Sequence, residues 1–115
     1  MQYLCLIYQN EQEWQKLSKS EAEKIIGEFS SYTESIKKSG NYAGGNALQP
    51  PHTATTVRVR NGRLATTDGS FAETKEQLGG YYLVQAKDLN EAIQVASRIP
   101  GARLGAVEVR PIMEF

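Results

Sequence analysis

The stretch Tyr3-Leu4-Cys5-Leu6-Ile7-Tyr8, near the start of this 115-residue chain, decides the fold. Successive side chains of a β-strand point to opposite faces of the sheet, so residues 3, 5 and 7 point one way and residues 4, 6 and 8 the other. Both sets are apolar or aromatic, which is typical of a strand whose sheet is covered on each side. Helices in so short a chain cover only one face. We therefore expect a second copy of the chain to cover the other face, and we predict a homodimer.

Two later segments also have the pattern of strands. Residues 80–86 are again apolar on both faces, and residues 105–112 alternate so that Val107 and Val109 are expected to point inward. Aromatic side chains recur in and near these strands, at Trp14, Tyr3, Tyr8, Tyr81 and Tyr82. They are expected in the core and the dimer interface, and the alternative is an aromatic pocket.

A β-hairpin is predicted in the middle of the chain. Residues 56–60 alternate, with Val57 and Val59 expected to point inward. The pair Asn61-Gly62 favours the two positive φ angles of a two-residue hairpin turn. Residues 63–67 then form the return strand.

Two main helices are predicted from their end signals. The first begins at a capping box that either Ser18 or Ser20 can start, carries apolar residues at helical spacing, and ends at Gly40. The second begins at Asp88 and ends at Pro100-Gly101.

Residues 40–53 are predicted to form a long connection, because Gly, Pro and Asn recur there without a period. A loop of that length in a compact domain is uncommon and is usually functional or flexible. His52, the only histidine of the chain, lies in this segment and is a candidate for proton transfer near neutral pH. The alternative is an exposed loop histidine without a role.

The run Asp68-Gly69-Ser70-Phe71-Ala72-Glu73-Thr74-Lys75-Glu76-Gln77-Leu78-Gly79-Gly80 concentrates charge between two predicted strands. Asp68-Gly69 is a turn pair. Ser70 and Glu73 fit the capping box of a short helix that reaches about Leu78. On this interpretation Ser70 and Glu73 are structural, and Lys75 is a solvated surface charge.

The same run also supports a functional interpretation. The free amide groups at a helix N-terminus favour an anion, with Lys75 or Arg58 as the counter-charge. Asp68 is then a candidate general base. The candidate catalytic residues are Asp68 and His52, and the candidate ligand-binding residues are Arg58, Ser70, Phe71, Glu73 and Lys75.

Composition restricts the class of protein. Lys+Arg and Asp+Glu both number 13, and zero net charge argues against a basic nucleic-acid footprint. A single cysteine excludes a disulfide within the chain and fits a reducing compartment, and Cys5 is expected to be a buried, inert thiol. No apolar run approaches the roughly 20 residues of a membrane helix, and no signal peptide precedes the first strand. We expect a cytoplasmic protein that contacts neither nucleic acid nor membrane.

Metal and nucleotide motifs are not found in the sequence. No Cys/His spacing fits zinc, and neither a P-loop nor a dinucleotide fingerprint is present. We expect no metal and no cofactor. The predicted order is β-α-β-β-(short helix)-β-α-β in a single α+β domain over residues 1–115, close to a ferredoxin-like split β-α-β plan with an added strand.

The motif run resembles the signature of the YCII-related family, in the branch named for the motif DGPFAETKE. The similarity extends over almost the whole chain, through residues 44–50, 53–58, 79–83, 88–92 and 107–111. One departure stands out, because the family has proline where this chain has Ser70. Proline suits the first turn of a helix, and serine replaces its rigidity with a hydrogen-bonding cap.

The resemblance implies a ferredoxin-like dimeric α/β barrel, an antiparallel sheet with two main helices on one face. It implies a cleft beside residues 68–76 that binds a small molecule, and it makes Asp68 the residue to carry over from a suggested His–Asp acid–base pair. Two hypotheses stay open. The protein is enzyme-like and binds a small molecule, with an anion as one candidate, or it is a non-catalytic regulatory module associated with transcription through an alternative sigma factor.

Overall fold

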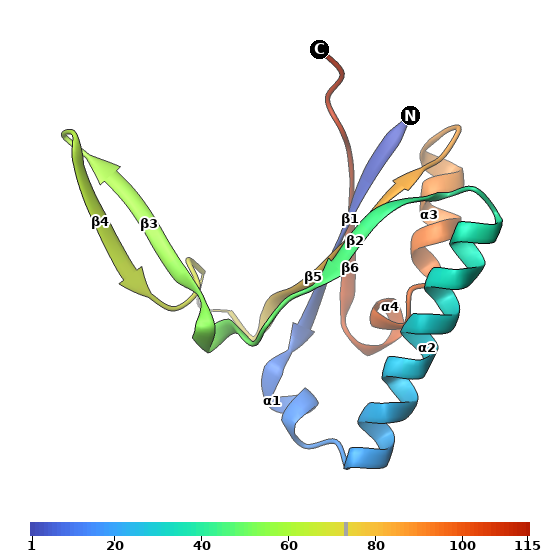
Figure 1. Ribbon diagram of the computed structural model, residues 1–115, viewed down its shortest axis with the longest axis horizontal. Helices are drawn as coiled ribbons and strands as arrows, with labels where there is room; N and C mark the ends of the chain where they lie inside the picture. The colour runs from blue at the N-terminus through green and yellow to red at the C-terminus, as the bar shows by residue number, and fades with distance from the viewer. Residues whose placement is uncertain (73) are drawn as a thin grey trace.

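The structure, a computed structural model, describes residues 1–72 and 74–115 and contains two antiparallel sheets (Figure 1). The predicted α+β class is confirmed. In chain order the elements are β1 (Gln2–Asn10), α1 (Glu11–Gln15), α2 (Lys19–Lys38), β2 (Tyr42–Ala47), the 3-10 turn η1 (Pro51–Thr53), β3 (Thr55–Arg60), β4 (Arg63–Asp68), β5 (Glu76–Gln85), α3 (Leu89–Ser97), α4 (Pro100–Leu104) and β6 (Ala106–Pro111).

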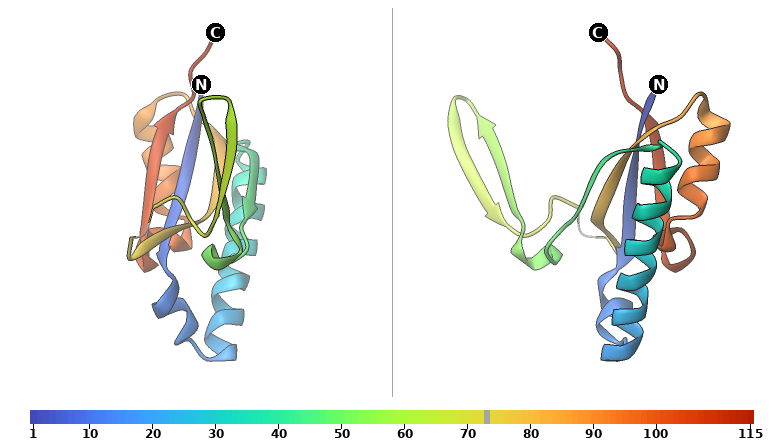
Figure 2. Two further views of the ribbon diagram at one scale, coloured as in Figure 1. Left: turned by 90° about the vertical axis from the view of Figure 1, so that its left-hand side faces the viewer. Right: turned by 45° about the vertical axis from the view of Figure 1, so that its right-hand side comes forward.

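The main sheet has the strand order β2-β5-β1-β6, and every neighbouring pair is antiparallel. The connection from β1 to β2 passes through α2 and skips β5, and the connection from β5 to β6 passes through α3 and skips β1. These are two interleaved split β-α-β units. Both helices lie on the same face of the sheet (Figures 1 and 2).

The core lies between that face and the helices. Tyr3, Cys5 and Ile7 of β1 are buried, as alternation predicts, and Val107 and Val109 of β6 pack against the same cluster. The other members are Tyr32, Ile36, Tyr82, Val84, Ala86, Ala92, Val95, Ala96 and Ile99. The Tyr32 hydroxyl donates a hydrogen bond to the Val95 carbonyl (2.7 Å), so a polar contact joins α2 to α3 inside the apolar layer.

The opposite face of the main sheet is uncovered; it is apolar on the central strands β1 and β5, whereas β6 contributes the charged pair Glu108 and Arg110. Leu4, Leu6 and Tyr8 of β1 are half-buried, and so are Tyr81 and Leu83 of β5. Cross-strand pairing places Leu4 beside Leu83 and Leu6 beside Tyr81. Helices α2, α3 and α4 lie on the other side of the sheet (Figure 2).

Local end signals explain where the main helices begin and stop. Ser18 accepts from the Glu21 amide, and the Glu21 carboxylate accepts from the Ser18 amide, which confirms the capping box. Gly40 follows the end of α2 with φ of 81°, a value that glycine adopts without strain. Asp88 caps α3 as predicted. Pro100, however, does not close α3, because it is the first residue of α4.

Strands β3 and β4 form a separate hairpin, here called the arm, that projects from the side of the sheet opposite the helices (Figures 1 and 2). Its turn is confirmed, with φ of 51° at Asn61 and 74° at Gly62. The inward placement of Val57 and Val59 is wrong, since they are 60% and 65% exposed. The arm pairs only with itself, so it adds no strand to the main sheet. Because the arm projects, the radius of gyration of the chain is 15.9 Å, whereas a compact chain of this length has about 13 Å.

Two predicted segments are wrong in their local structure. Residues 40–53 contain the edge strand β2, whose glycines pair through the backbone and leave no side-chain period. At Gly45 a Cβ atom would lie 2.9 Å from the Tyr81 carbonyl oxygen, so the close approach of β2 to β5 requires glycine there.

The short helix from Ser70 to Leu78 is also wrong, because β5 begins at Glu76 and pairs with β1. The Gln77 side chain instead donates to the Ala72 and Thr74 carbonyls, and Phe71, Ala72 and Lys75 are in bends. This removes the helix N-terminus on which an anion site depended. Glu73, a candidate in both interpretations, lies outside the described residues.

Candidate functional site

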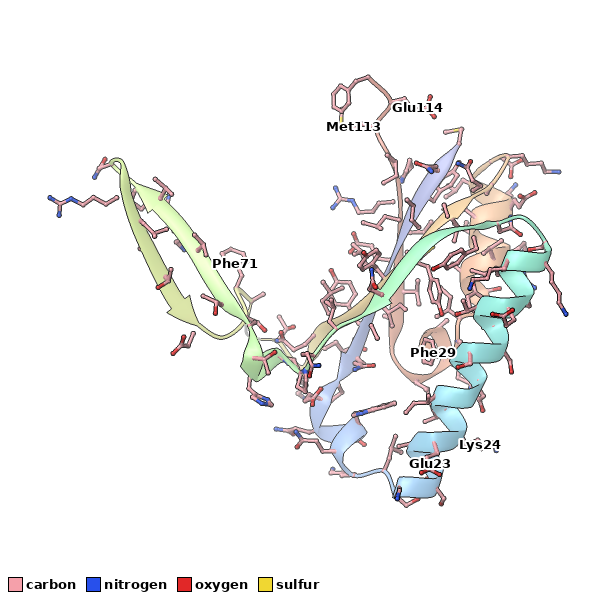
Figure 3. All side chains as sticks on the ribbon, in the orientation of Figure 1. Glu23, Lys24, Phe29, Phe71, Met113 and Glu114 are labelled. Atoms are coloured by element: carbon pink, nitrogen blue, oxygen red, sulfur yellow. The ribbon has the colours of Figure 1, made fainter. Side chains whose placement is uncertain are left out.

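Several of the sequence-predicted site residues lie on the arm or at its base. Asp68 is the last residue of β4, is exposed, and pairs through its backbone with Thr55. Arg58 and Phe71 are brought together, with the guanidinium carbon 5.0 Å from the ring centroid. Figure 3 shows Phe71 against the arm. This contact is a cation–π pair at the surface.

The remaining candidates are more scattered. Ser70 is half-buried, Lys75 is exposed, and His52 is exposed in η1. In the described part of the chain no hydrogen bond or ion pair joins His52 to Asp68. Within residues 1–72 and 74–115, no three His, Cys, Asp or Glu side chains are grouped as a metal site requires.

A half-open space lies elsewhere, between the middle of α2 and one end of the main sheet. It has a volume of about 610 Å³, which is within the usual range for small-molecule pockets. Its walls come from β1, α1, α2, β2, the segment after β2, and β5. We call this space the α2 cavity. A second depression, of about 400 Å³, is shallow and lies over the first turn of α3.

The inner wall of the α2 cavity is apolar and aromatic, with Ile7, Phe29 and Tyr82 among its members. Figure 3 shows Phe29 on the α2 side of this space. The Thr33 hydroxyl donates to the Phe29 carbonyl (2.9 Å) and shares a hydrogen bond of 2.7 Å with the Tyr82 hydroxyl. Burial raises the pKa of Tyr82 above that of an ordinary tyrosine, so its phenol stays protonated at neutral pH.

The mouth of the α2 cavity is more polar. The Asn46 side-chain amide donates to the Tyr81 hydroxyl (2.8 Å), and both residues line the space. Glu11 and Trp14 lie three residues apart on α1 and both line it, so one face of this short helix points at the cavity. Glu11 is the single charged residue among the lining residues that the structure describes.

Of the described residues of the motif run, only the last two touch the α2 cavity. Gly79 and Gly80 line the space, whereas Asp68, Ser70, Phe71, Lys75, Arg58 and His52 do not. At Gly79 a Cβ atom would lie 2.7 Å from the Gln9 side-chain nitrogen. Glycine there lets the Gln9 side chain lie across β5.

Sequence reasoning missed most of this cavity. The aromatic-pocket alternative did name Trp14, Tyr81 and Tyr82, all of which line it. Glu11 was missed together with α1. A signal was present, because Asn10 is a favourable N-cap and its side chain accepts from the Gln12 and Glu13 amides.

Cys5 is fully buried in the core, as predicted. Burial raises the pKa of its thiol to about 11, so the thiolate is scarce at neutral pH. Cys5 is therefore a packing residue. In the described chain no helix combines the length and apolar character needed to cross a membrane.

Comparison with known proteins identifies relatives over the full length. The YCII-related domain matches residues 1–115. An uncharacterized protein, R00369, from Rhizobium meliloti (strain 1021), is 35% identical over 114 residues, which are 97% of this chain and 92% of that protein. The resemblance carried by the motif run is thereby confirmed, and the chain belongs to the YCII-related family.

Proposed function

We propose that the protein is a homodimer of ferredoxin-like subunits that binds a small molecule in the α2 cavity of each subunit. The observation that carries this proposal is the cavity itself, about 610 Å³ of space with an apolar inner wall and a few polar groups at its mouth. Ligand pockets have this combination, because apolar walls supply affinity and a few polar groups orient the ligand.

The position of the α2 cavity gives a structural reason for the two glycines at the end of the motif run. Gly79-Gly80 bring the backbone of β5 against the cavity, where side chains would reduce its volume. The proposed site therefore lies at the C-terminal end of the motif run, whereas the sequence predicted a cleft beside residues 68–76. Regulation through a sigma factor and a cytoplasmic location stay predictions.

The test uses Trp14, the only tryptophan of the chain, as a reporter in the cavity wall. A library of small amphiphilic fragments is titrated while Trp14 emission is followed. We expect Ser30→Phe to abolish the response, because Ser30 lines the cavity on α2 and a phenyl group would occupy it. Ser31→Phe is the matched control, since the neighbouring Ser31 is exposed and outside the cavity wall.

The proposal fails if fragments that change Trp14 emission bind both variants as well as the parent protein. If the fragments change Trp14 emission in the parent protein and in Ser31→Phe but not in Ser30→Phe, the result supports binding in the α2 cavity. Far-ultraviolet circular dichroism of both variants serves as the control that helix α2 is retained.

The homodimer is supported by two apolar surfaces that the single chain leaves open. One is the uncovered face of the main sheet around Leu6 and Tyr81, and the other is the arm face with Val57, Val59 and Leu64. Isolated two-stranded hairpins are at best marginally stable in water. A second copy that packs its sheet face to face, with each arm against the partner, would bury both surfaces.

Leu6→Arg is expected to convert the dimer into a monomer. Leu6 lies at the centre of the uncovered face, paired with Tyr81 on one side and Glu108 on the other, so an arginine there is tolerated by the subunit but not by an apolar interface. Light scattering should give about twice 12.8 kDa for the parent protein and 12.8 kDa for the variant. Leu89→Arg, on the helix side and already 48% exposed, should remain dimeric. A monomeric parent at micromolar concentration would contradict the dimer.

A further inference from the structure

The charge distribution of the α2 cavity restricts the kind of ligand that fits it. Among the 19 lining residues in the described part of the chain Glu11 is the single charged side chain, and neither lysine nor arginine is one of them. Glu11 is half-buried. A carboxylate in such a position favours a positively charged or hydrogen-bond-donating partner, and it disfavours an anion.

Within the described residues the ion pairs leave Glu11 available. Each of the four pairs joins other residues, and Glu13 on the same helix is paired with Lys16 at 3.4 Å. One cation contacts a lining residue: the ammonium of Lys37 lies 5.1 Å from the centroid of the Tyr42 ring. Lys37 does not itself line the cavity, and its own carboxylate partner, Glu34, is 3.7 Å away.

Trp14 gives the same corner of the cavity a second preference for cations. It lies one helical turn after Glu11 and lines the same space. An indole face attracts an ammonium group, and it does so more strongly when the pair is removed from water. The inner wall, with Ile7 and Phe29, offers an apolar surface for the rest of a ligand.

We infer that the α2 cavity binds protonated organic amines with an apolar body, the ammonium group at Glu11 and Trp14 and the body against the inner wall. This inference rests on the proposed function, since it names the ligand class of the same site. It also replaces the expectation of an anionic ligand, which depended on a helix N-terminus that the structure does not form.

The experiment compares three probes with one phenylbutyl body and different head groups: phenylbutylamine, phenylbutanol and phenylpentanoate. Their binding to the full-length protein is measured by Trp14 fluorescence and by calorimetry. We expect the amine to bind about tenfold more tightly than the alcohol, and the carboxylate to bind more weakly than both. Raising the salt concentration should weaken the amine more than the alcohol.

Two variants test whether Glu11 causes the preference for the amine. Glu11→Gln keeps the shape of the side chain and removes its charge, so the amine should fall to the affinity of the alcohol while the alcohol is unchanged. Glu13→Gln is the matched control, because Glu13 is on the same helix but faces solvent. It should leave all three affinities unchanged.

The outcomes separate the two proposals. If the alcohol binds as tightly as the amine, or if Glu11→Gln leaves the amine preference intact, the inference is overturned while the cavity remains a binding site. Tightest binding of the carboxylate also overturns it. If none of the three probes binds the parent protein, both the amine inference and the proposed function fail for this class of body.

Discussion

Replacing Ile36 with alanine is expected to lower the free energy of unfolding by about 2–5 kcal/mol. Ile36 lies on the inner face of α2, is fully buried, and belongs to the cluster that joins both main helices to β1 and β5. Alanine removes buried methyl and methylene groups, and the cavity left behind is only partly filled by relaxation of its neighbours.

The matched control is Ile26→Ala, the same substitution ten positions earlier on the same helix. Ile26 is 57% exposed, so its loss should change stability by no more than about 0.5 kcal/mol. Urea denaturation, followed by circular dichroism, measures both; the protein concentration is fixed because the proposed dimerisation would make the midpoint depend on it. Equal losses for the two variants would contradict the placement of the core.

Local patterns predicted the elements whose stability is local. The alternation in residues 3–8, the capping box at Ser18, the cap at Asp88 and the turn at Asn61-Gly62 are all confirmed. In each case a few neighbouring residues determine the backbone conformation through side-chain alternation, a hydrogen bond or a positive φ angle. Such signals can be found without knowledge of what the segment contacts.

Segments whose structure depends on distant partners were predicted poorly. Residues 42–47 carry too many glycines for a strand signal, yet their backbone pairs with β5. Residues 76–78 fit a capped helix locally, but pairing with β1 extends them. Pairing between strands far apart in sequence outweighs a local cap, because it satisfies a whole row of backbone groups.

The candidate site shows the same division. The run 68–80 concentrates charge, but of its described charged residues Asp68 ends the arm, Glu76 begins β5, and neither these two nor Lys75 line the α2 cavity. The α2 cavity is assembled from segments far apart in the chain, and only the pairing of β5 with β1 and β2 brings Gln9 and Asn46 beside Gly79-Gly80. Under the proposed dimer, Asp68, which pairs with Thr55 on the same face of the arm as Val57, would lie where the arm meets the partner subunit, whereas Arg58 is on the opposite face.

Gly105→Ala is expected to lower the free energy of unfolding by about 3 kcal/mol, through overpacking against a backbone that cannot yield cheaply. Gly105 lies between α4 and β6, and its amide donates to the Gly101 carbonyl (2.8 Å). A Cβ atom there would lie 2.2 Å from the Tyr8 carbonyl oxygen. Relief of this clash must move β6 away from β1, at the point where Tyr8 pairs with Ala106.

Gly27→Ala makes the same chemical change with the opposite expected sign. Gly27 is an exposed residue inside α2, and a Cβ atom there meets nothing within 4 Å. Alanine should raise stability by about 0.5–1 kcal/mol, because it restricts the unfolded chain and favours the helix. Paired urea denaturation of the two variants tests the α4–β6 corner directly. A Gly105→Ala protein as stable as its parent would show that β6 does not approach β1 as closely as the structure places it.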